Sequence, residues 1–181
     1  MTTFDALPVV GVSGSPGKTS RSRTLLERAL SALERLGARP QLVDLTALPA
    51  DGLLGRRQDA DVTDALAAVQ GARILVVSTP VYRATYSGLL KVFFDLLPQD
   101  ALAGKVAVAI ATGATPAHFL AVDHGLRPLL ASVGVLPVPT AVYGIDGQFR
   151  EGTPDRSLIE QVDRAVAEAA TLAGLVPALE G

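Results

Sequence analysis

The sequence contains no cysteine and no tryptophan, and only 4 % of its residues are aromatic. Without cysteine, disulfides, thiolate metal sites and thiol redox chemistry are excluded, so any electron transfer must use a bound cofactor. Lysine and arginine (16 residues) nearly balance aspartate and glutamate (18), which gives a formal net charge of -2. We expect no nucleic-acid partner, because phosphate binding needs clustered cations and single strands need aromatic stacking platforms.

Long apolar runs are also missing. No segment approaches the roughly 18 apolar residues of a membrane span, and the start MTTFDALPVV lacks a basic region followed by a long apolar one. We therefore expect a soluble, cytoplasmic protein with no membrane partner. Of the 181 residues 49 % are apolar and 19 % are charged, which is typical of a folded chain. The length predicts a single domain over residues 1–181.

Apolar runs alternate with stretches of helical period, which is the pattern of βα units around a parallel sheet buried on both faces. Pro137 and Pro139 interrupt the last run and place it at a sheet edge, because proline cannot donate to a strand ladder. Helix starts are predicted at Asp61 and at two Thr-Pro pairs, Thr115-Pro116 and Thr153-Pro154. The predicted strands cover residues 8–13, 39–45, 72–78, 105–111 and 135–143, and the main helices cover residues 20–36, 87–97, 116–133 and 154–173.

Five such units predict an α/β fold, a doubly wound five-stranded parallel sheet of order 2-1-3-4-5 with helices on both faces. Ligands in such sheets bind beyond the carboxyl ends of the strands, at the switch point between strands 1 and 3. Three loops rich in Gly, Ser, Thr or Pro lie at that end: residues 14–20, 79–86 and 112–115.

The first loop places hydroxyls, glycines and cations before a helix N-terminus, which suits a phosphate. Its spacing does not fit a nucleotide P-loop, because Val12 stands where that motif needs glycine. A nucleophile elbow fails because Ser15 stands at its fifth position, and the dinucleotide fingerprint G-x-G-x-x-G is absent. A phosphate site without metal and a Gly/Ser turn with ordinary capping both remain open.

The other two loops suggest a wall for a flat ring. Residues 80–88 contain Tyr82 and Tyr86 beside the stiff Pro80, which suits packing against a planar heterocycle, although the tyrosines could simply cover the end of the sheet. The small residues 112–115 let backbone amides approach a ligand. The helix expected to begin at Pro116 would favour negative charge developing on a ring.

Three segments carry a resemblance to a known family: GSPGKTSRSRTLL, STPVYRATYSGLLKVFFDLLP and LAGKVAVAIATGATPAHFLAVDHGLRPLL. They resemble the NAD(P)H-dependent FMN reductases, which have a flavodoxin-like fold. They are most similar to the alkanesulfonate and methanesulfonate branch, the reductase halves of two-component monooxygenases. The similarity covers residues 9–143.

The resemblance implies the cofactor-binding residues. Hydroxyls and backbone amides of the first loop would hold the FMN phosphate, the second loop would line the flavin, and the third would meet its pyrimidine side. Three cations would be available to the 2′-phosphate of NADPH, namely Lys18, Arg21 and Arg83. The residues so implied are Ser15, Ser20, Arg21 and Ser22 for the phosphate, Pro80, Val81, Tyr82 and Ser87 for the ring, and Thr112, Gly113, Ala114 and Thr115 for the pyrimidine.

Two departures from the family pattern bear on affinity. Many relatives carry arginine where this chain has Gly17, so one phosphate partner would be missing, with Lys18 as a substitute. Many carry glycine where this chain has Ala114, so a positive φ there would be strained. Both departures predict modest FMN affinity, which suits a flavin used as a substrate.

The resemblance further implies hydride transfer from C4 of NADPH or NADH to N5 of FMN, with no catalytic side chain and no metal, because the cofactor carries the chemistry. Reduced FMN would pass to an FMN-dependent monooxygenase. His124 matches a family position linked to a π-bulge at a subunit interface, which implies a dimer or tetramer; a solvated helix histidine is the plain alternative. Metal binding is not expected, because His118 and His124 would lie on different faces of one helix. The same helix is predicted to bury Phe119, Val122, Leu126, Leu129 and Val133.

Three other functions are considered. A flavodoxin-like electron carrier would hold FMN tightly, and such carriers are usually strongly acidic, unlike this chain. A quinone or azo reductase with retained FMN would keep the fold and change the acceptor. A P-loop hydrolase is disfavoured by the spacing at Val12.

Overall fold

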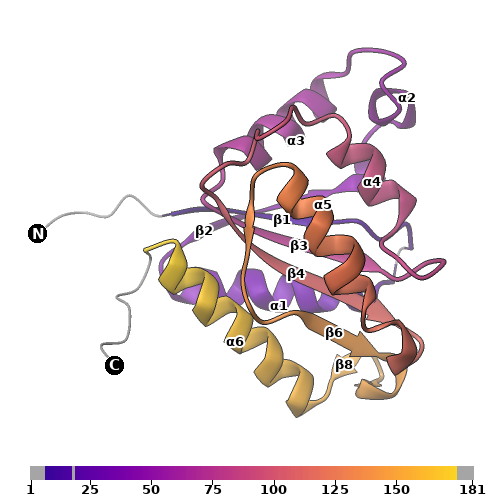
Figure 1. Cartoon of the computed structure of the whole chain (residues 1–181), viewed down its shortest axis with the longest axis vertical. Helices are drawn as coiled ribbons and strands as arrows, with labels where there is room; N and C mark the ends of the chain where they lie inside the picture. Colours follow the sequence, from indigo (N-terminus) through magenta and orange to yellow (C-terminus); the bar gives the residue numbers. More distant parts are fainter. Residues whose placement is uncertain (1–6, 18, 175–181) are drawn as a thin grey trace, which may run out of the picture.

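The computed structural model describes residues 7–17 and 19–174. Its main sheet is parallel and has the order β2-β1-β3-β4-β5, with β6 also pairing with β4 (Figure 1). This confirms the predicted order 2-1-3-4-5 and the flavodoxin-like α/β class. The strands are β1 (Pro8–Ser13), β2 (Arg39–Asp44), β3 (Ile74–Pro80), β4 (Val106–Gly113), β5 (Leu136–Pro137) and β6 (Val142–Ile145).

Helices cover both faces of this sheet, as Figure 1 shows. One face packs on α1 (Arg21–Arg35) and α6 (Arg156–Leu172). The other packs on α3 (Ala60–Gly71), α4 (Gly88–Phe94) and α5 (Arg127–Ser132). The central strands are buried on both sides, since Val9 belongs to one core cluster and Val10 to the other. Short elements complete the order: η1 (Leu45–Ala47), α2 (Ala50–Leu53), η4 (Asp146–Gln148), and the hairpin of β7 (Phe149–Arg150) with β8 (Thr153–Pro154).

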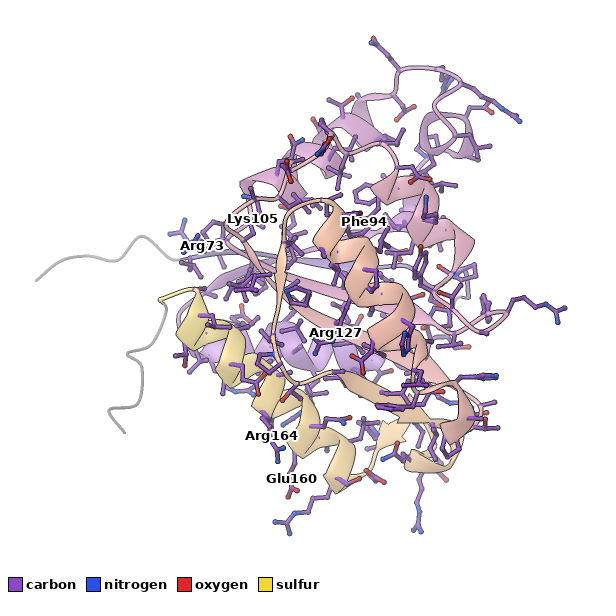
Figure 2. The ribbon with its side chains drawn as sticks, in the orientation of Figure 1. Arg73, Phe94, Lys105, Arg127, Glu160 and Arg164 are labelled. Carbon is purple, nitrogen blue, oxygen red and sulfur yellow. The ribbon has the colours of Figure 1, made fainter. Side chains whose placement is uncertain are left out.

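The last strand of the main sheet is split rather than continuous. β5 and β6 both pair with β4, and the segment between them carries Pro139. Side chains bind the backbone groups that the gap leaves without strand partners. Glu168 accepts hydrogen bonds from the Thr140 amide (2.7 Å) and hydroxyl (2.6 Å), and Arg127, labelled in Figure 2, donates to the carbonyls of Val138 (2.7 Å) and Pro139 (2.5 Å).

Two predicted helix caps were wrong. α3 is capped by Asp59, whose carboxylate accepts from the Asp61 amide at 3.1 Å, so Asp61 is already inside the helix. Thr153 does not cap α6, because it pairs in β8. Asp155 caps α6 instead and accepts from the Leu158 amide at 2.9 Å. In both cases a nearby aspartate takes the capping position.

The helix expected over residues 116–133 is broken into three pieces: a 3₁₀ turn η2 (Pro116–His118), a π-helical segment η3 (Val122–Leu126), and α5. The Arg127 amide bonds the Val122 carbonyl five residues back. Pro128 favours the change of register, because it has no N–H to donate to the His124 carbonyl and its ring clashes with that carbonyl. Of the five residues expected to face inward, four are buried, but Phe119 is 47 % exposed.

No helix among the described residues is long and apolar enough to span a membrane.

Candidate functional site

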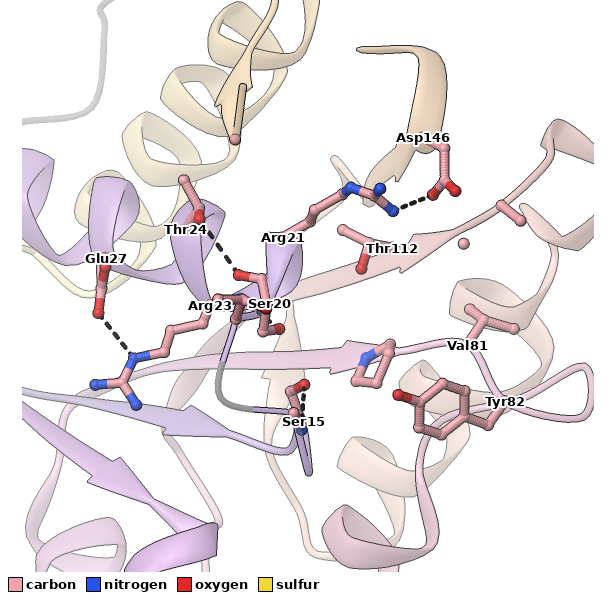
Figure 3. Close-up of a pocket in the computed structure, with 16 residues that line it drawn as sticks. Ser15, Ser20, Arg21, Arg23, Thr24, Glu27, Val81, Tyr82, Thr112 and Asp146 are labelled. Carbon is pink, nitrogen blue, oxygen red and sulfur yellow. Dashed lines mark hydrogen bonds and ion pairs between the residues drawn. The ribbon is translucent and has the colours of Figure 1, made fainter. Parts of the chain in front are cut away.

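A cavity of about 830 Å³ opens where β1, β3 and β4 end, at the predicted switch point (Figure 3). All three predicted loops contribute to it, together with the first turns of α1 and the segment after β6. Its lining consists of Ser15, Gly17, Thr19, Ser20, Arg21, Arg23, Thr24, Glu27, Pro80, Val81, Tyr82, Thr112, Gly113, Ala114, Asp146 and Gly152.

The first loop presents hydroxyls and amides around the N-terminus of α1. Ser20 is the N-cap of this 15-residue helix, and its hydroxyl lies 3.3 Å from the Arg23 amide and 2.9 Å from the Ser22 hydroxyl. The Ser15 hydroxyl accepts from the Gly17 amide at 3.3 Å. Ser22 is fully buried beneath the cavity and does not line it. The hydroxyls of Ser15 and Ser20 are therefore held in place at the wall.

Two arginines of α1 line the cavity, and each is paired with carboxylates. Arg21 forms an ion pair with Asp146, and its guanidinium carbon lies 5.8 Å from the centre of the Phe149 ring. Arg23 pairs with Glu27 at 2.8 Å and also with Asp44 at the end of β2. The hydrogen bond that Arg23 donates to the Glu27 carboxylate is the main cause of a raised pKa for Arg23. Positive and negative charge are thus nearly matched along this wall.

The second loop forms the opposite wall. Val81 donates to the Thr112 carbonyl at 2.7 Å and so joins this loop to the end of β4. Tyr82 and Thr85 exchange backbone hydrogen bonds of 2.8 and 3.3 Å, which makes Arg83 and Ala84 the two central residues of a tight turn. Both have positive φ, 50° and 67°, which costs non-glycine residues roughly 1–2 kcal/mol each. The turn leaves Tyr82 half exposed at the cavity, and Arg83 is not in the lining.

Ser87 does not line the cavity either. It is buried, its hydroxyl donates to the Gly14 carbonyl and accepts from the Leu90 amide (3.1 Å), and its amide donates to Thr79 (2.9 Å). Ser87 therefore caps α4 and ties together the loops that follow β1 and β3.

The third loop lines the cavity through Thr112, Gly113 and Ala114, whereas Thr115 is not in the lining. Ala114 is not among the described residues with positive φ, so the expectation of a strained backbone at this position was wrong. Only the single 3₁₀ turn η2 begins at Pro116. The expected effect of a long helix on a charged ring therefore has no structural basis.

The structure brings most of the predicted site residues to one cavity. Lys18 lies outside the described residues. Predicted residues in the lining are Ser15, Gly17, Ser20, Arg21, Pro80, Val81, Tyr82, Thr112, Gly113 and Ala114, and those not in it are Ser22, Arg83, Ser87 and Thr115.

Other lining residues were missed. Thr24 and Glu27 follow Ser20 at four and seven residues, so the face of α1 could have been found from helical period. Asp146 and Gly152 come from the segment after β6, where the sequence shows no motif.

A smaller hollow of about 270 Å³ lies beside η3. Both His118 and His124 line it, although one regular α-helix would have put them on different faces. His124 lies in the π-helical segment, as the resemblance implies. The described residues contain no group of three His, Asp or Glu side chains placed to hold a metal ion.

The family model described as NADPH-dependent FMN reductase matches residues 7–150. The chain belongs to this family. A Pseudomonas putida FMN reductase (NADPH) is 39 % identical over 86 % of this chain and 80 % of its own length. The NADH-dependent FMN reductase SfnE of Pseudomonas putida is 35 % identical over 91 % of this chain and 90 % of that protein.

Among solved structures, the apo form of an NADH:FMN oxidoreductase, EMOB, superimposes with a TM-score of 0.84 at 37 % identity, over 94 % of this chain and 91 % of that one. Membership makes this chain an oxidoreductase of the FMN reductase family, whose flavin is FMN and whose reductant is NADPH or NADH.

Proposed function

We propose that the large cavity binds FMN as a freely exchanging substrate and that the protein reduces this FMN with NADPH or NADH. The reduced flavin would then be supplied to a partner monooxygenase. The observation that carries this proposal is the joining, in one cavity, of a hydroxyl-rich helix N-terminus to an apolar wall with small residues opposite.

The end of the cavity at the N-terminus of α1 has the donors that a phosphate monoester needs. Ser15, Thr19 and Ser20 supply hydroxyls, the first turn of α1 supplies amides, and Arg21 supplies a charge. Amides at a helix N-terminus carry partial positive charge and favour an anion. We assign the FMN phosphate to this end.

The end of the cavity between residues 80–82 and residues 112–114 has a shape that suits the flat flavin ring. Pro80, Val81 and Tyr82 form one wall, and residues 112–114 offer peptide groups with little side chain to keep a ligand away. FMN held here would supply its N5 as the acceptor of a hydride from the nicotinamide. The protein's part is orientation, since holding two reactants in the reacting geometry removes a large entropic part of a barrier.

No acid or base is assigned to the cavity. Its described ionisable side chains apart from Tyr82 are Arg21, Arg23, Glu27 and Asp146, and each is engaged in an ion pair. We assign the Arg23–Glu27 pair to shaping the wall and Asp146 to holding Arg21 beside the phosphate end, because a hydride transfer between two cofactors needs no proton at that step.

Two features support exchange of the flavin and a protein partner. Gly17 offers no side chain to the phosphate end, and Tyr82 and Arg21 remain about half exposed, so the ligand would be only partly enclosed.

The relatives named SfnE and SfnF are described as NADH-dependent FMN reductases. The sulfonate-related branch that the sequence resembles suggests a monooxygenase of sulfur metabolism.

We further propose that copies of the chain associate through the face around η3. Phe119 and Leu120 are 47 % and 51 % exposed there, beside the hollow that His118 and His124 line. Two neighbouring exposed apolar side chains next to a hollow are typical of an association surface. A dimer or tetramer is expected.

An anaerobic FMN titration followed by NADPH addition tests the function. We expect micromolar FMN binding and bleaching of flavin in large excess over protein. Protein isolated with tightly held FMN that bleaches only one equivalent would indicate a quinone or azo reductase instead. Tight binding without bleaching would indicate an electron carrier, and no FMN binding would refute the proposal.

A further inference from the structure

Tyr143 lies behind the cavity wall, on the strand next to β4. It pairs in register with Ala111, two residues before Gly113, and its side chain is buried. Its hydroxyl donates to the Thr115 carbonyl at 2.8 Å. The phenol thus crosses the end of β4 and holds the far end of the loop that supplies Thr112, Gly113 and Ala114 to the cavity.

The phenol leaves no room for a side chain at position 113, where the chain has glycine. A Cβ at that position would lie 2.2 Å from the Tyr143 hydroxyl oxygen and 3.2 Å from its Cζ. Gly113 does not have positive φ, so glycine is required by space and not by backbone conformation. The loop therefore passes directly over the phenol, and the hydroxyl sets how far the loop stands from β6.

The phenol is held from a second side. Its ring meets the Phe119 ring edge to face, with centres 6.4 Å apart, which fixes the phenol between the loop and the segment that follows it. Burial, with a smaller contribution from Asp146, raises the pKa of Tyr143. The hydroxyl therefore keeps its proton and stays a donor at neutral pH.

We propose that Tyr143 is a positioning residue for the flavin: it sets the placement of the Thr112–Ala114 wall without touching the ligand. The inference rests on the proposed function, because the wall has this meaning only if FMN binds there. The described cavity lining does not include Tyr143, so removal of its hydroxyl acts through the loop alone.

The test compares FMN dissociation constants of the full-length protein by quenching of flavin fluorescence. Tyr143→Phe is expected to raise Kd about five- to tenfold, because one hydrogen bond that orders the wall is lost, and to change the absorption spectrum of the bound flavin. Tyr86→Phe is the matched control, because Tyr86 does not line the cavity and no hydrogen bond of its hydroxyl is found within the described part of the chain; the Kd of this variant should not change.

A second pair of variants separates positioning from general destabilisation. Gly113→Ala is expected to weaken FMN binding, because its Cβ has no room beside the hydroxyl. Adding Tyr143→Phe leaves Cζ at 3.2 Å as the nearest contact, so the double variant should bind FMN more tightly than Gly113→Ala alone, although Tyr143→Phe by itself weakens binding.

An unchanged Kd for Tyr143→Phe, or additive effects in the double variant, would overturn the assignment of Tyr143 while wild-type FMN binding stands. Failure of the wild-type protein to bind FMN would overturn the proposed function, and the assignment with it.

Discussion

Ser87 offers the sharpest test of how the site is built, because sequence resemblance places it against the flavin whereas the structure buries it beneath the loops. Ser87→Ala removes the side-chain cap of α4, which costs about 1 kcal/mol. It also removes the described partner of the buried Gly14 carbonyl, and an unsatisfied buried acceptor costs about 1–3 kcal/mol. The free energy of unfolding should fall by about 2–4 kcal/mol.

For a chain of this length that loss lowers Tm by about 4–16 °C, measurable by circular dichroism without ligand. Ser132→Ala is the matched control, because its hydroxyl also donates to a backbone carbonyl, that of Leu129, but at an exposed helix end; we expect a change within about 0.5 kcal/mol. FMN affinity of the Ser87 variant, measured well below its Tm, should stay within about twofold. A stability loss below about 0.5 kcal/mol together with a tenfold rise in Kd would refute this reasoning.

Three further predictions concern the phosphate end of the cavity, the ion pair at the end of β2 and the face around η3. Gly17→Arg should lower the Kd for FMN about three- to tenfold at low salt, because a Cβ there meets nothing closer than 3.4 Å and a guanidinium adds a charge-assisted bond to phosphate; an unchanged Kd would mean that the phosphate lies elsewhere. Although partial burial opposes it, hydrogen bonds from Thr46 and Arg23 hold the pKa of Asp44 below its usual 3.8, so Asp44 stabilises the fold above about pH 4 and this contribution is lost as the pH falls through the lowered pKa. Asp44→Asn should therefore flatten the acid side of a stability–pH curve, and an unaltered curve would contradict the pairing. Leu120→Glu should reduce the molar mass measured by light scattering, and an unchanged mass would place the association surface elsewhere.

The sheet order could be predicted because buried parallel strands need apolar residues on both faces. β1, β3 and β4 are nearly continuous runs of such residues, as in Val106–Gly113, and the Gly/Ser-rich loops mark their carboxyl ends. The family resemblance implied the hydroxyls of Ser15 and Ser20, and both residues line the cavity.

The remaining features depend on contacts distant in sequence. Asp146 reaches the cavity only because β6 sits beside β4 and Arg21 lies opposite. The family resemblance assigned Ser87 to the flavin, yet its hydroxyl donates to the carbonyl of Gly14, 73 residues away. The break at η3 differs from these features, because Pro128 is a local signal for it and the family position of His124 also implied a π-bulge; the regular spacing of apolar residues nevertheless predicted one continuous helix.

The split strand at the β5–β6 edge limits how this molecule can associate. An open sheet edge normally offers a row of unpaired amides and carbonyls on which another chain can add a strand. Here Glu168 binds the Thr140 amide, and Arg127 binds the carbonyls of Val138 and Pro139, so the edge is closed by the molecule's own side chains. Fibre-like growth by strand addition is blocked at this edge, and docking of helical surfaces is left as the route to larger assemblies on this side of the protein.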